Sequence, residues 1–271
     1  MRRTLTETFS GQINPTWTIT EIATSKVSAG AGLLTLHNEP VDARYTNAQI
    51  TDYDYRTFEF RWKPPLRMTI SARASAAGDQ LRGTAGFGFW NHPFSPDVEH
   101  FHRSLQLPQA IWFFFGAPPN AMELAHGVPG YGWKASTIDA GRPSALALIP
   151  LALPAVLLMQ SRPLYELIYP KIQRALAIGE CVLDGALLAD MHTYTIDWQR
   201  DGAQFAIDGR CVYETPFSPR GACGFVAWID NQYASISPRG AFSAGVVPLE
   251  QPQSLSISSI HIESTGTSDE E

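Results

Sequence analysis

Charged residues are scarce in this chain of 271 residues, and neither sign of charge is concentrated in one segment. Asp, Glu, Lys and Arg make up only 17% of the sequence, and the formal net charge is -6. A nucleic-acid-binding domain ordinarily shows a basic patch or stripe, so we expect no nucleic-acid partner. Hydrophobic residues reach 44%, which excludes a disordered chain because such chains lack the apolar residues that a core needs.

Cysteine is also scarce. Cys181, Cys211 and Cys223 are the three cysteines, and an odd, low number argues against a disulfide framework. We expect buried free thiols in a reducing compartment. No apolar run follows the two arginines at the N-terminus, so the start of the chain does not resemble a secretory signal. The sequence therefore predicts a cytoplasmic protein.

Long apolar runs are missing except at 144–160, which contains two prolines and is shorter than the roughly 20 residues of a membrane-spanning helix. Gly-rich phosphate loops, nucleophile elbows and His-Glu-x-x-His metal motifs are absent from the sequence. We accordingly expect neither an organic cofactor nor a bound metal ion.

What the sequence does have is the two-residue alternation of apolar and polar side chains that is typical of half-buried strands. We predict strands on this basis at 57–63, 67–75, 193–198, 203–208 and 224–230. The Asp-Gly pairs at 201–202 and 208–209 predict tight hairpin turns, because Asp and Gly tolerate a positive φ angle. In the last strand the apolar parity changes near Ser258, which a β-bulge would explain.

One segment, 141–189, departs from the alternation and shows helical spacing instead. We expect a pair of helices here, the second capped by Ser161 with Pro163 in its first turn. Three roles remain open for the insert: a helix pair packed on the convex sheet, a cover over the ligand groove, or a contact surface for a membrane or another chain through 144–160. The prediction is a single domain over 1–265 with a disordered tail at 266–271.

The segment HTYTIDWQRDGAQFAIDGRCVYETPFSP, residues 192–219, resembles a hallmark of the family 16 glycoside hydrolases and their concanavalin A-like relatives. Further resemblance lies in the Arg-rich strand at 67–75, in the strand 83–94 with its Phe-Trp pair, and in the closing strand at 256–263. The resemblance implies an all-β, concanavalin A-like β-sandwich, or jelly roll, with the helical insertion at about 141–189.

The same resemblance implies that three carboxylates should lie on one strand, as Glu-x-Asp-x-x-Glu or Glu-x-Asp-x-Glu. The matching strand is 108–120, where the acid positions hold Ala110, Trp112 and Phe114 or Phe115. No carboxylate lies between Glu99 and Glu123. Retaining hydrolysis needs two carboxyl groups about 5–5.5 Å apart, so the sequence predicts that the usual chemistry of the family has been lost.

Aromatic residues replace those acids, which favours a flat or apolar ligand. In 224–230 the alternation places Trp228 and Asp230 on the concave groove, and in 130–136 we assign Tyr131 and Trp133 to the same groove. The alternatives are that Trp112 and its neighbours fill a closed core and that Asp230 begins a turn at an exposed strand end. The predicted ligand-binding residues are Trp90, Trp112, Phe114, Tyr131, Trp133, Trp228 and Asn231.

Acid–base groups are expected from Asp230 and from the loop 91–102, which is rich in ionisable residues. Glu99 and His100 are the candidates in that loop. His100 and His102 have the alternate spacing of two metal ligands on a strand, but a surface loop explains them better, and no metal site is predicted.

The leading hypothesis is a non-hydrolytic, family 16-like sandwich that binds a largely apolar or aromatic small molecule without a cofactor. If the protein is an enzyme, isomerase- or cyclase-type chemistry is favoured over retaining glycoside hydrolysis. The first alternative is a carbohydrate-binding protein or an atypical glycoside hydrolase, because sugar clefts also use Trp platforms. The second is a structural or interaction domain that uses the apolar insert.

Overall fold

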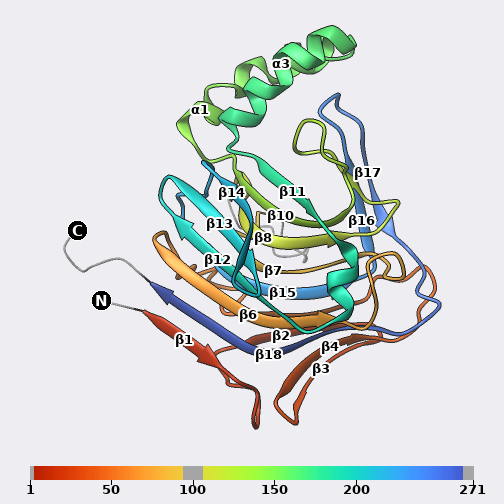
Figure 1. The fold of residues 1–271 in the computed structure, drawn as a ribbon. Coiled ribbons are helices and arrows are strands. Elements are labelled where there is room, and N and C mark those ends of the chain that lie inside the picture. Colours follow the sequence, from red (N-terminus) through yellow and green to blue (C-terminus); the bar gives the residue numbers. More distant parts are fainter. Residues whose placement is uncertain (1–2, 94–105, 265–271) are drawn as a thin grey trace.

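The computed structural model describes residues 3–93 and 106–264, and two antiparallel sheets packed face to face dominate it (Figure 1). One sheet has eight strands. In spatial order they are β14 (Arg210–Thr215), β13 (Gly202–Ile207), β12 (His192–Gln199), β6 (Leu66–Ala74), β18 (Gln253–Ser264), β4 (Leu33–Asn38) and β3 (Ser25–Gly30), with β1 (Thr4–Glu7) also paired to β18.

The second large sheet has seven strands, in the spatial order β11 (Gly179–Leu183), β10 (Gly132–Asp139), β8 (Gln109–Gly116), β7 (Thr84–Trp90), β15 (Gly224–Asp230), β5 (Asn47–Thr51) and β2 (Thr18–Ile22). A small third sheet contains β17 (Phe242–Val246), β16 (Gln232–Ile236) and β9 (Ala121–Met122). The prediction of an all-β sandwich is confirmed.

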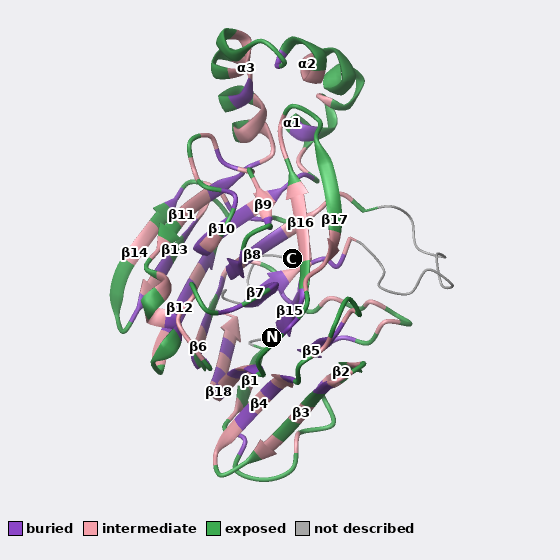
Figure 2. Cartoon of the chain, turned by 90° about the vertical axis from the view of Figure 1, so that its right-hand side faces the viewer, coloured by how far each residue is buried: buried purple, intermediate pink, exposed green. Residues whose placement is uncertain are grey.

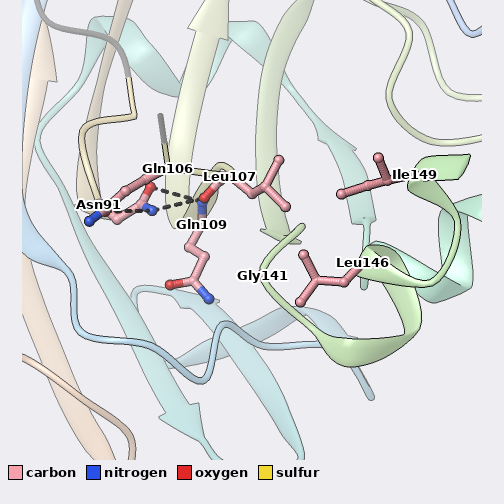
Figure 3. A pocket seen from close by; sticks show the side chains of 7 residues that line it. All are labelled: Asn91, Gln106, Leu107, Gln109, Gly141, Leu146 and Ile149. Carbon is pink, nitrogen blue, oxygen red and sulfur yellow. Dashed lines mark hydrogen bonds between the residues drawn. The ribbon is translucent and has the colours of Figure 1, made fainter. Parts of the chain in front are cut away.

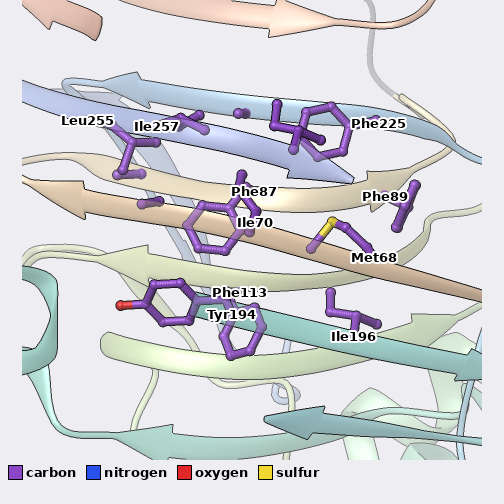
Figure 4. Close-up of a cluster of buried hydrophobic side chains, with 14 of the residues drawn as sticks. Met68, Ile70, Phe87, Phe89, Phe113, Tyr194, Ile196, Phe225, Leu255 and Ile257 are labelled. Carbon is purple, nitrogen blue, oxygen red and sulfur yellow. The ribbon is translucent and has the colours of Figure 1, made fainter. Parts of the chain in front are cut away.

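The core lies between the two large sheets, where side chains from alternate positions of each strand meet (Figure 4). Met68 and Ile70 of β6 and Tyr194 of β12 face Phe87 of β7 and Phe225 of β15, and all five are buried. Burial of one such side chain stabilises the fold by about 1.5–3 kcal/mol. The inward and outward faces predicted for 67–75, 193–198, 203–208 and 224–230 agree with this core.

The predicted turn and bulge are also present. Asp208 and Gly209 have φ angles of 49° and 77° between β13 and β14, as a tight Asp-Gly hairpin turn requires. The pairing of β18 with β6 shifts between Ile257 and Ser259, so a bulge surrounds Ser258. This bulge lets Leu255 and Ile260 reach the core despite their different parity.

The strand predicted at 57–63 is wrong. Asp54 accepts hydrogen bonds from the backbone N–H groups of Arg56 and Thr57, at 2.7 and 2.8 Å, and so folds this segment into a turn. Phe58 then has a φ angle of 50°, which strand geometry forbids. Only Trp62 pairs with a neighbouring chain segment, as an isolated bridge to Cys223.

The cysteines are free, as expected, but only Cys223 is fully buried. Cys181 is half-buried and Cys211 is exposed on β14. Buried thiols were predicted for all three cysteines, and this prediction holds only for Cys223.

The helical insert contains α1 (Pro143–Leu146), η2 (Ile149–Leu151), α2 (Ala152–Leu158) and α3 (Arg162–Ala175). It ends at Ala175 rather than 189, because 179–183 pairs with β10 as strand β11, followed by the short η3 (Gly185–Ala189). Ser161 is the N-cap residue of α3, but its side chain makes no capping hydrogen bond. Within the described residues, no helix combines the length and apolarity needed to cross a bilayer.

The insert stands beyond one end of the sandwich (Figure 1). Helix α3 contacts two loops, one after β9 and one between β16 and β17. Gln173 Oε1 accepts from His126 N at 2.9 Å, and the Arg239 guanidinium lies 5.0 Å from the Tyr165 ring centre. Tyr169 O–H donates to the carbonyl of Leu124. This packing differs from the alternative in which the helices cover the convex sheet.

Candidate functional site

Strand β8 has apolar side chains on both faces. Ile111, Phe113 and Phe115 point into the core between the sheets. Because side chains alternate along a strand, Ala110, Trp112 and Phe114 point the other way, to what we call the outer face of the seven-stranded sheet. These are the positions at which the sequence resemblance placed three acids.

Two glycines of β7 lie between the outward side chains of its neighbours. Gly86 is paired with Phe114 of β8 and Trp228 of β15, and Gly88 is paired with Trp112. A Cβ atom on Gly86 would lie 2.4 Å from the Phe113 carbonyl oxygen and 2.8 Å from the Trp228 ring. The missing side chains therefore let rings from β8 and β15 meet across β7.

Four rings meet there, and we call Trp90, Trp112, Phe114 and Trp228 the outer aromatic cluster. The Trp112 ring centre lies 5.4 Å from that of Trp228, 5.6 Å from that of Phe114 and 5.8 Å from that of Trp90. These separations are typical of favourable aromatic pairs. Phe114 and Trp228 are buried, whereas Trp90 and Trp112 are half-buried. The accessible ring surface therefore belongs to Trp90 and Trp112.

An ion pair borders the cluster on the β10 side. Lys134 of β10 is paired with Phe114 in the strand register, and its Nζ lies 3.5 Å from Glu180 Oε1 on β11. Ser136 Oγ and Ala125 N also donate to the Glu180 carboxylate, at 3.3 and 3.1 Å. Burial lowers the pKa of Lys134 and raises that of Glu180, and their mutual attraction opposes both shifts. Sequence reasoning missed this pair, because 46 residues separate its members.

Asp230, predicted as an acid or base, is enclosed. Its Oδ1 accepts from Thr84 Oγ1 at 2.8 Å, and from the N–H groups of Thr84 and Gln232 at 3.2 Å each. Thr84 Oγ1 in turn accepts the Trp228 indole N–H at 2.9 Å. Burial raises the pKa of Asp230 to about 7. The carboxyl group thus positions the Trp228 ring through Thr84. The predicted role in the groove requires an exposed carboxyl group, whereas that of Asp230 is buried.

A polar group borders the cluster on the opposite side. The Trp90 indole N–H donates to Tyr53 Oη at 2.6 Å, and Tyr53 Oη lies 3.1 Å from His92 Nδ1. Tyr55 Oη accepts from Thr20 Oγ1 at 3.2 Å and from the Gln49 side-chain amide. Tyr55 and Thr20 are half-buried. The sequence gives no signal for Tyr53 or Tyr55, since both lie just outside β5, where no alternation marks them.

Trp133 and Asn231, which were predicted to line the groove, do not join the outer aromatic cluster. Trp133 is 1% exposed and packs between the sheets, with its ring 5.8 Å from both Phe87 and Phe113. Trp133 and Lys134 are consecutive in β10, so one of them must face the core. Lys134 there would lose its partner Glu180 and leave a buried charge unpaired, so Trp133 faces the core instead. Asn231 is buried, and its side chain holds backbone groups of Arg44, Thr46 and Val247.

The other predicted site residues fall in three groups. The structure brings Trp90, Trp112, Phe114 and Trp228 together in one cluster. Tyr131 lies before β10 with half of its side chain exposed, and it is not part of the outer aromatic cluster. Glu99, His100 and His102 lie outside the described residues.

Two carboxylates, Asp230 and Glu180, point outward from the described strands of this face. They sit on β15 and β11, which are four strand spacings apart, or about 19 Å at the usual spacing of about 4.8 Å. Glycoside hydrolysis by a carboxyl pair needs a separation of about 5–5.5 Å for retention or 6.5–9.5 Å for inversion. Asp230 and Glu180 therefore cannot serve as such a pair.

A separate open pocket of about 540 Å³ lies at the base of the insert, between the start of β8 and α1 (Figure 3). Its polar side chains are engaged within the protein: Asn91 Nδ2 donates to the Leu107 carbonyl at 2.9 Å, and Gln109 Nε2 donates to Asp139 Oδ1 at 2.6 Å. Leu107, Leu146 and Ile149 supply apolar walls. The pocket is distinct from the outer aromatic cluster.

Comparison with known proteins relates the fold to carbohydrate-active proteins. No family model and no curated protein matches the chain. A Crh5 transglycosylase in complex with NAG is similar in structure, with a TM-score of 0.51, 14% identity, and coverage of 97% of this chain and 84% of that chain. An endo-acting O-glycanase of the human gut microbiota matches at a TM-score of 0.53 and 9% identity, covering 97% and 99% of the two chains.

An endo-β-galactosidase from Clostridium perfringens matches at a TM-score of 0.50 and 12% identity, over 96% of this chain and 62% of that one. Identities this low establish the fold and leave the activity open. The fold predicted from the segment 192–219 is confirmed: this chain has the concanavalin A-like lectin/glucanase fold of the family 16 glycoside hydrolases and Crh transglycosylases.

Proposed function

We propose that this protein binds a carbohydrate on the outer face of the seven-stranded sheet and does not cleave it by the two-carboxylate route. The observation that carries the proposal is the pair of half-buried rings of Trp90 and Trp112, whose centres lie 5.8 Å apart on the face where the acids are expected. Their ring planes differ by 39°.

The physical basis is stacking between an aromatic ring and the apolar C–H face of a sugar, with hydroxyl groups free to bond at the edges. Trp presents a large, rigid apolar surface, and its cost in side-chain entropy is small because the rings already pack on one another. Hydroxyl groups lie near Trp90: its indole N–H donates to Tyr53 Oη, and the Tyr55 ring centre lies 6.0 Å from that of Tyr53. A few polar groups around an apolar floor are typical of small-molecule sites.

The structural relatives support a carbohydrate as the ligand class, since they include a transglycosylase complexed with NAG, an O-glycanase and an endo-β-galactosidase. The outward positions of β8 distinguish this chain: Ala110, Trp112 and Phe114 supply no proton donor or nucleophile. Binding without retaining hydrolysis is therefore the function that the described residues fit best.

Calorimetry with oligosaccharides of N-acetylglucosamine and of β-linked galactose tests the proposal. We expect binding by the intact chain, a loss of roughly tenfold or more in affinity for Trp112→Ala, and no release of reducing ends. Phe242→Ala is the matched control, because Phe242 is an aromatic residue of β17 with 73% of its surface exposed. Failure of every glycan to bind, or unchanged affinity in Trp112→Ala, contradicts the proposal.

A second candidate is binding of an apolar or aromatic small molecule, which the composition of the cluster itself favours. Val226 and Met122 pack against the four rings, so the floor of the site is entirely apolar. Such a ligand would raise the melting temperature of the protein by an amount that grows with the logarithm of ligand concentration above the Kd, and Trp112→Ala would remove that shift. Isomerase- or cyclase-type chemistry stays a prediction, and the buried Asp230 is not the accessible acid or base that it needs.

A further inference from the structure

The helical insert exposes an unusual number of aliphatic side chains. Thirteen large hydrophobic residues are exposed among those the structure describes, and seven of them fall between residues 146 and 167. We call this set the insert leucine surface; it consists of Leu146, Ile149, Leu151, Leu153, Leu157, Leu158 and Leu167. Contiguous exposed apolar surface of this kind marks an interaction site on a soluble protein.

These side chains are exposed because another side of the insert already packs inward. Met159 at the end of α2 and Tyr169 of α3 are 2% and 5% exposed, whereas Leu153 and Leu157 are 71% and 65% exposed. Figure 2 shows most of α2 and parts of α3 coloured as exposed, beyond the buried strands of the sandwich. The leucines are therefore not needed to hold the insert on the protein.

The charges around the surface are positive, although the whole chain is acidic with a net charge of -6. No Asp or Glu occurs from Ala140 to Tyr165. Arg162 has 85% of its side chain exposed, and Lys171 and Arg174 are exposed on α3. The one acid of the helices, Glu166, lies 2.7 Å from His126 Nε2 and 3.9 Å from Arg162 Nε.

We propose that the insert leucine surface docks on the anionic surface of a lipid bilayer and lies in the interface without crossing it. Apolar side chains bordered by Lys and Arg are what interfacial helices present to a membrane, where aliphatic groups enter the acyl boundary and cations meet anionic headgroups. The helices are too short to span. The sandwich would then stand on the bilayer by one end, with the outer aromatic cluster on a separate part of the molecule.

Charge argues against a second copy of this chain as the occupant. In a two-fold dimer the same patch meets itself, so Arg162, Lys171 and Arg174 would approach their own like charges. Glu166 is already engaged by His126 and Arg162, so it is not available to neutralise them. An anionic lipid surface satisfies both the apolar and the cationic groups.

Vesicle co-sedimentation of the full chain tests the proposal. We compare vesicles of phosphatidylcholine alone with vesicles that also contain phosphatidylglycerol, and expect binding to the anionic ones that weakens with added salt. Leu153→Glu and Leu157→Glu should each lower the partition coefficient roughly tenfold or more. Lys171→Gln and Arg174→Gln should each lower it about fivefold on anionic vesicles.

Ile19→Glu is the matched control, since Ile19 is an exposed aliphatic residue of β2, outside the insert, and its change should leave vesicle binding unaltered. Thermal melting of each variant shows that the fold is retained, and unaltered glycan binding would separate this surface from the proposed ligand face. The proposal is overturned if anionic vesicles are not bound or if neutral vesicles bind equally well. It is also overturned if sedimentation shows a dimer that Leu153→Glu dissociates.

Discussion

The sandwich and the helical insert use the same aliphatic and aromatic residues in opposite ways. In the sandwich, Phe113 is 0% exposed and its ring lies about 5 to 6 Å from those of Tyr194, Phe205 and Trp133. In the insert, Leu153 is 71% exposed. Stability of the chain explains the first arrangement but not the second, and this difference is the reason that we propose a membrane partner for the insert.

The largest expected effect is loss of core packing in the sandwich. Phe113→Ala should lower the free energy of unfolding by about 3–5 kcal/mol, because it removes a buried ring and leaves a cavity. Chemical denaturation measures this change. A loss below about 1 kcal/mol would show that the core relaxes around the missing ring, and the contrast between the two regions would then weaken.

The next effect concerns the buried ion pair of the outer face. Lys134→Met leaves the Glu180 carboxylate buried with Ser136 and Ala125 as donors, and should cost about 3 kcal/mol near pH 8. At pH 4 the cost should be smaller, because Glu180 can take up a proton. Lys171→Met, at an exposed position of α3, is the control and should change little. An equal cost at both pH values would contradict the pairing.

The pH dependence of stability sharpens the comparison further, because buried acids lie in the sandwich. Burial raises the pKa of Asp230 from 3.8 to about 7 and that of Asp52 to about 6. A raised pKa means that the folded state holds the proton more tightly. The stabilisation that protonated Asp230 gives to the folded state is therefore fully present below about pH 4. It falls by about 1.4 kcal/mol per pH unit as the pH rises, and it is lost above about pH 7.

Asp230→Asn isolates that contribution, since an amide oxygen can still accept from Thr84 and Gln232. Denaturation at a series of pH values should show that the variant gains stability relative to the parent chain from pH 4 to pH 8. A difference that does not vary with pH would mean that Asp230 is ionised at all of these pH values, and the described burial would be wrong.

The smallest expected effect lies in the insert. Leu153→Gln should change the free energy of unfolding by less than about 0.5 kcal/mol, as is usual for exposed positions. Melting curves and denaturant titrations measure it. A loss of about 2 kcal/mol or more would show that Leu153 packs within the protein, and the difference between the two regions would disappear.

Much of the fold could be predicted from the sequence because half-buried strands carry their own signal. The alternation in 193–198 and 203–208 identified the inward residues, the Asp208-Gly209 pair identified a turn, and the change of parity near Ser258 identified a bulge. In each case the signal is local, since neighbouring residues determine which side chain faces the core.

The site was less predictable because it depends on which strands are neighbours. The IWFFF run of β8 is apolar on both faces, so only strand register shows that Trp112 points outward. Register also places Lys134 beside Glu180 and so turns Trp133 into the core. The end of the insert was misplaced because the helical spacing around 164–176 gives way to an edge strand, β11, that has little alternation of its own.

The two glycines of β7, Gly86 and Gly88, have a consequence for the shape of the outer aromatic cluster. Gly86 and Gly88 decide how closely the indole and phenyl groups of adjacent strands can approach, because a Cβ atom at either position would collide with β8. The shape of the outer aromatic cluster is thus encoded as much by two absent methyl groups as by the bulky residues around them. A search for distant homologues that share the cluster should look for this spaced glycine pair as well as for tryptophan.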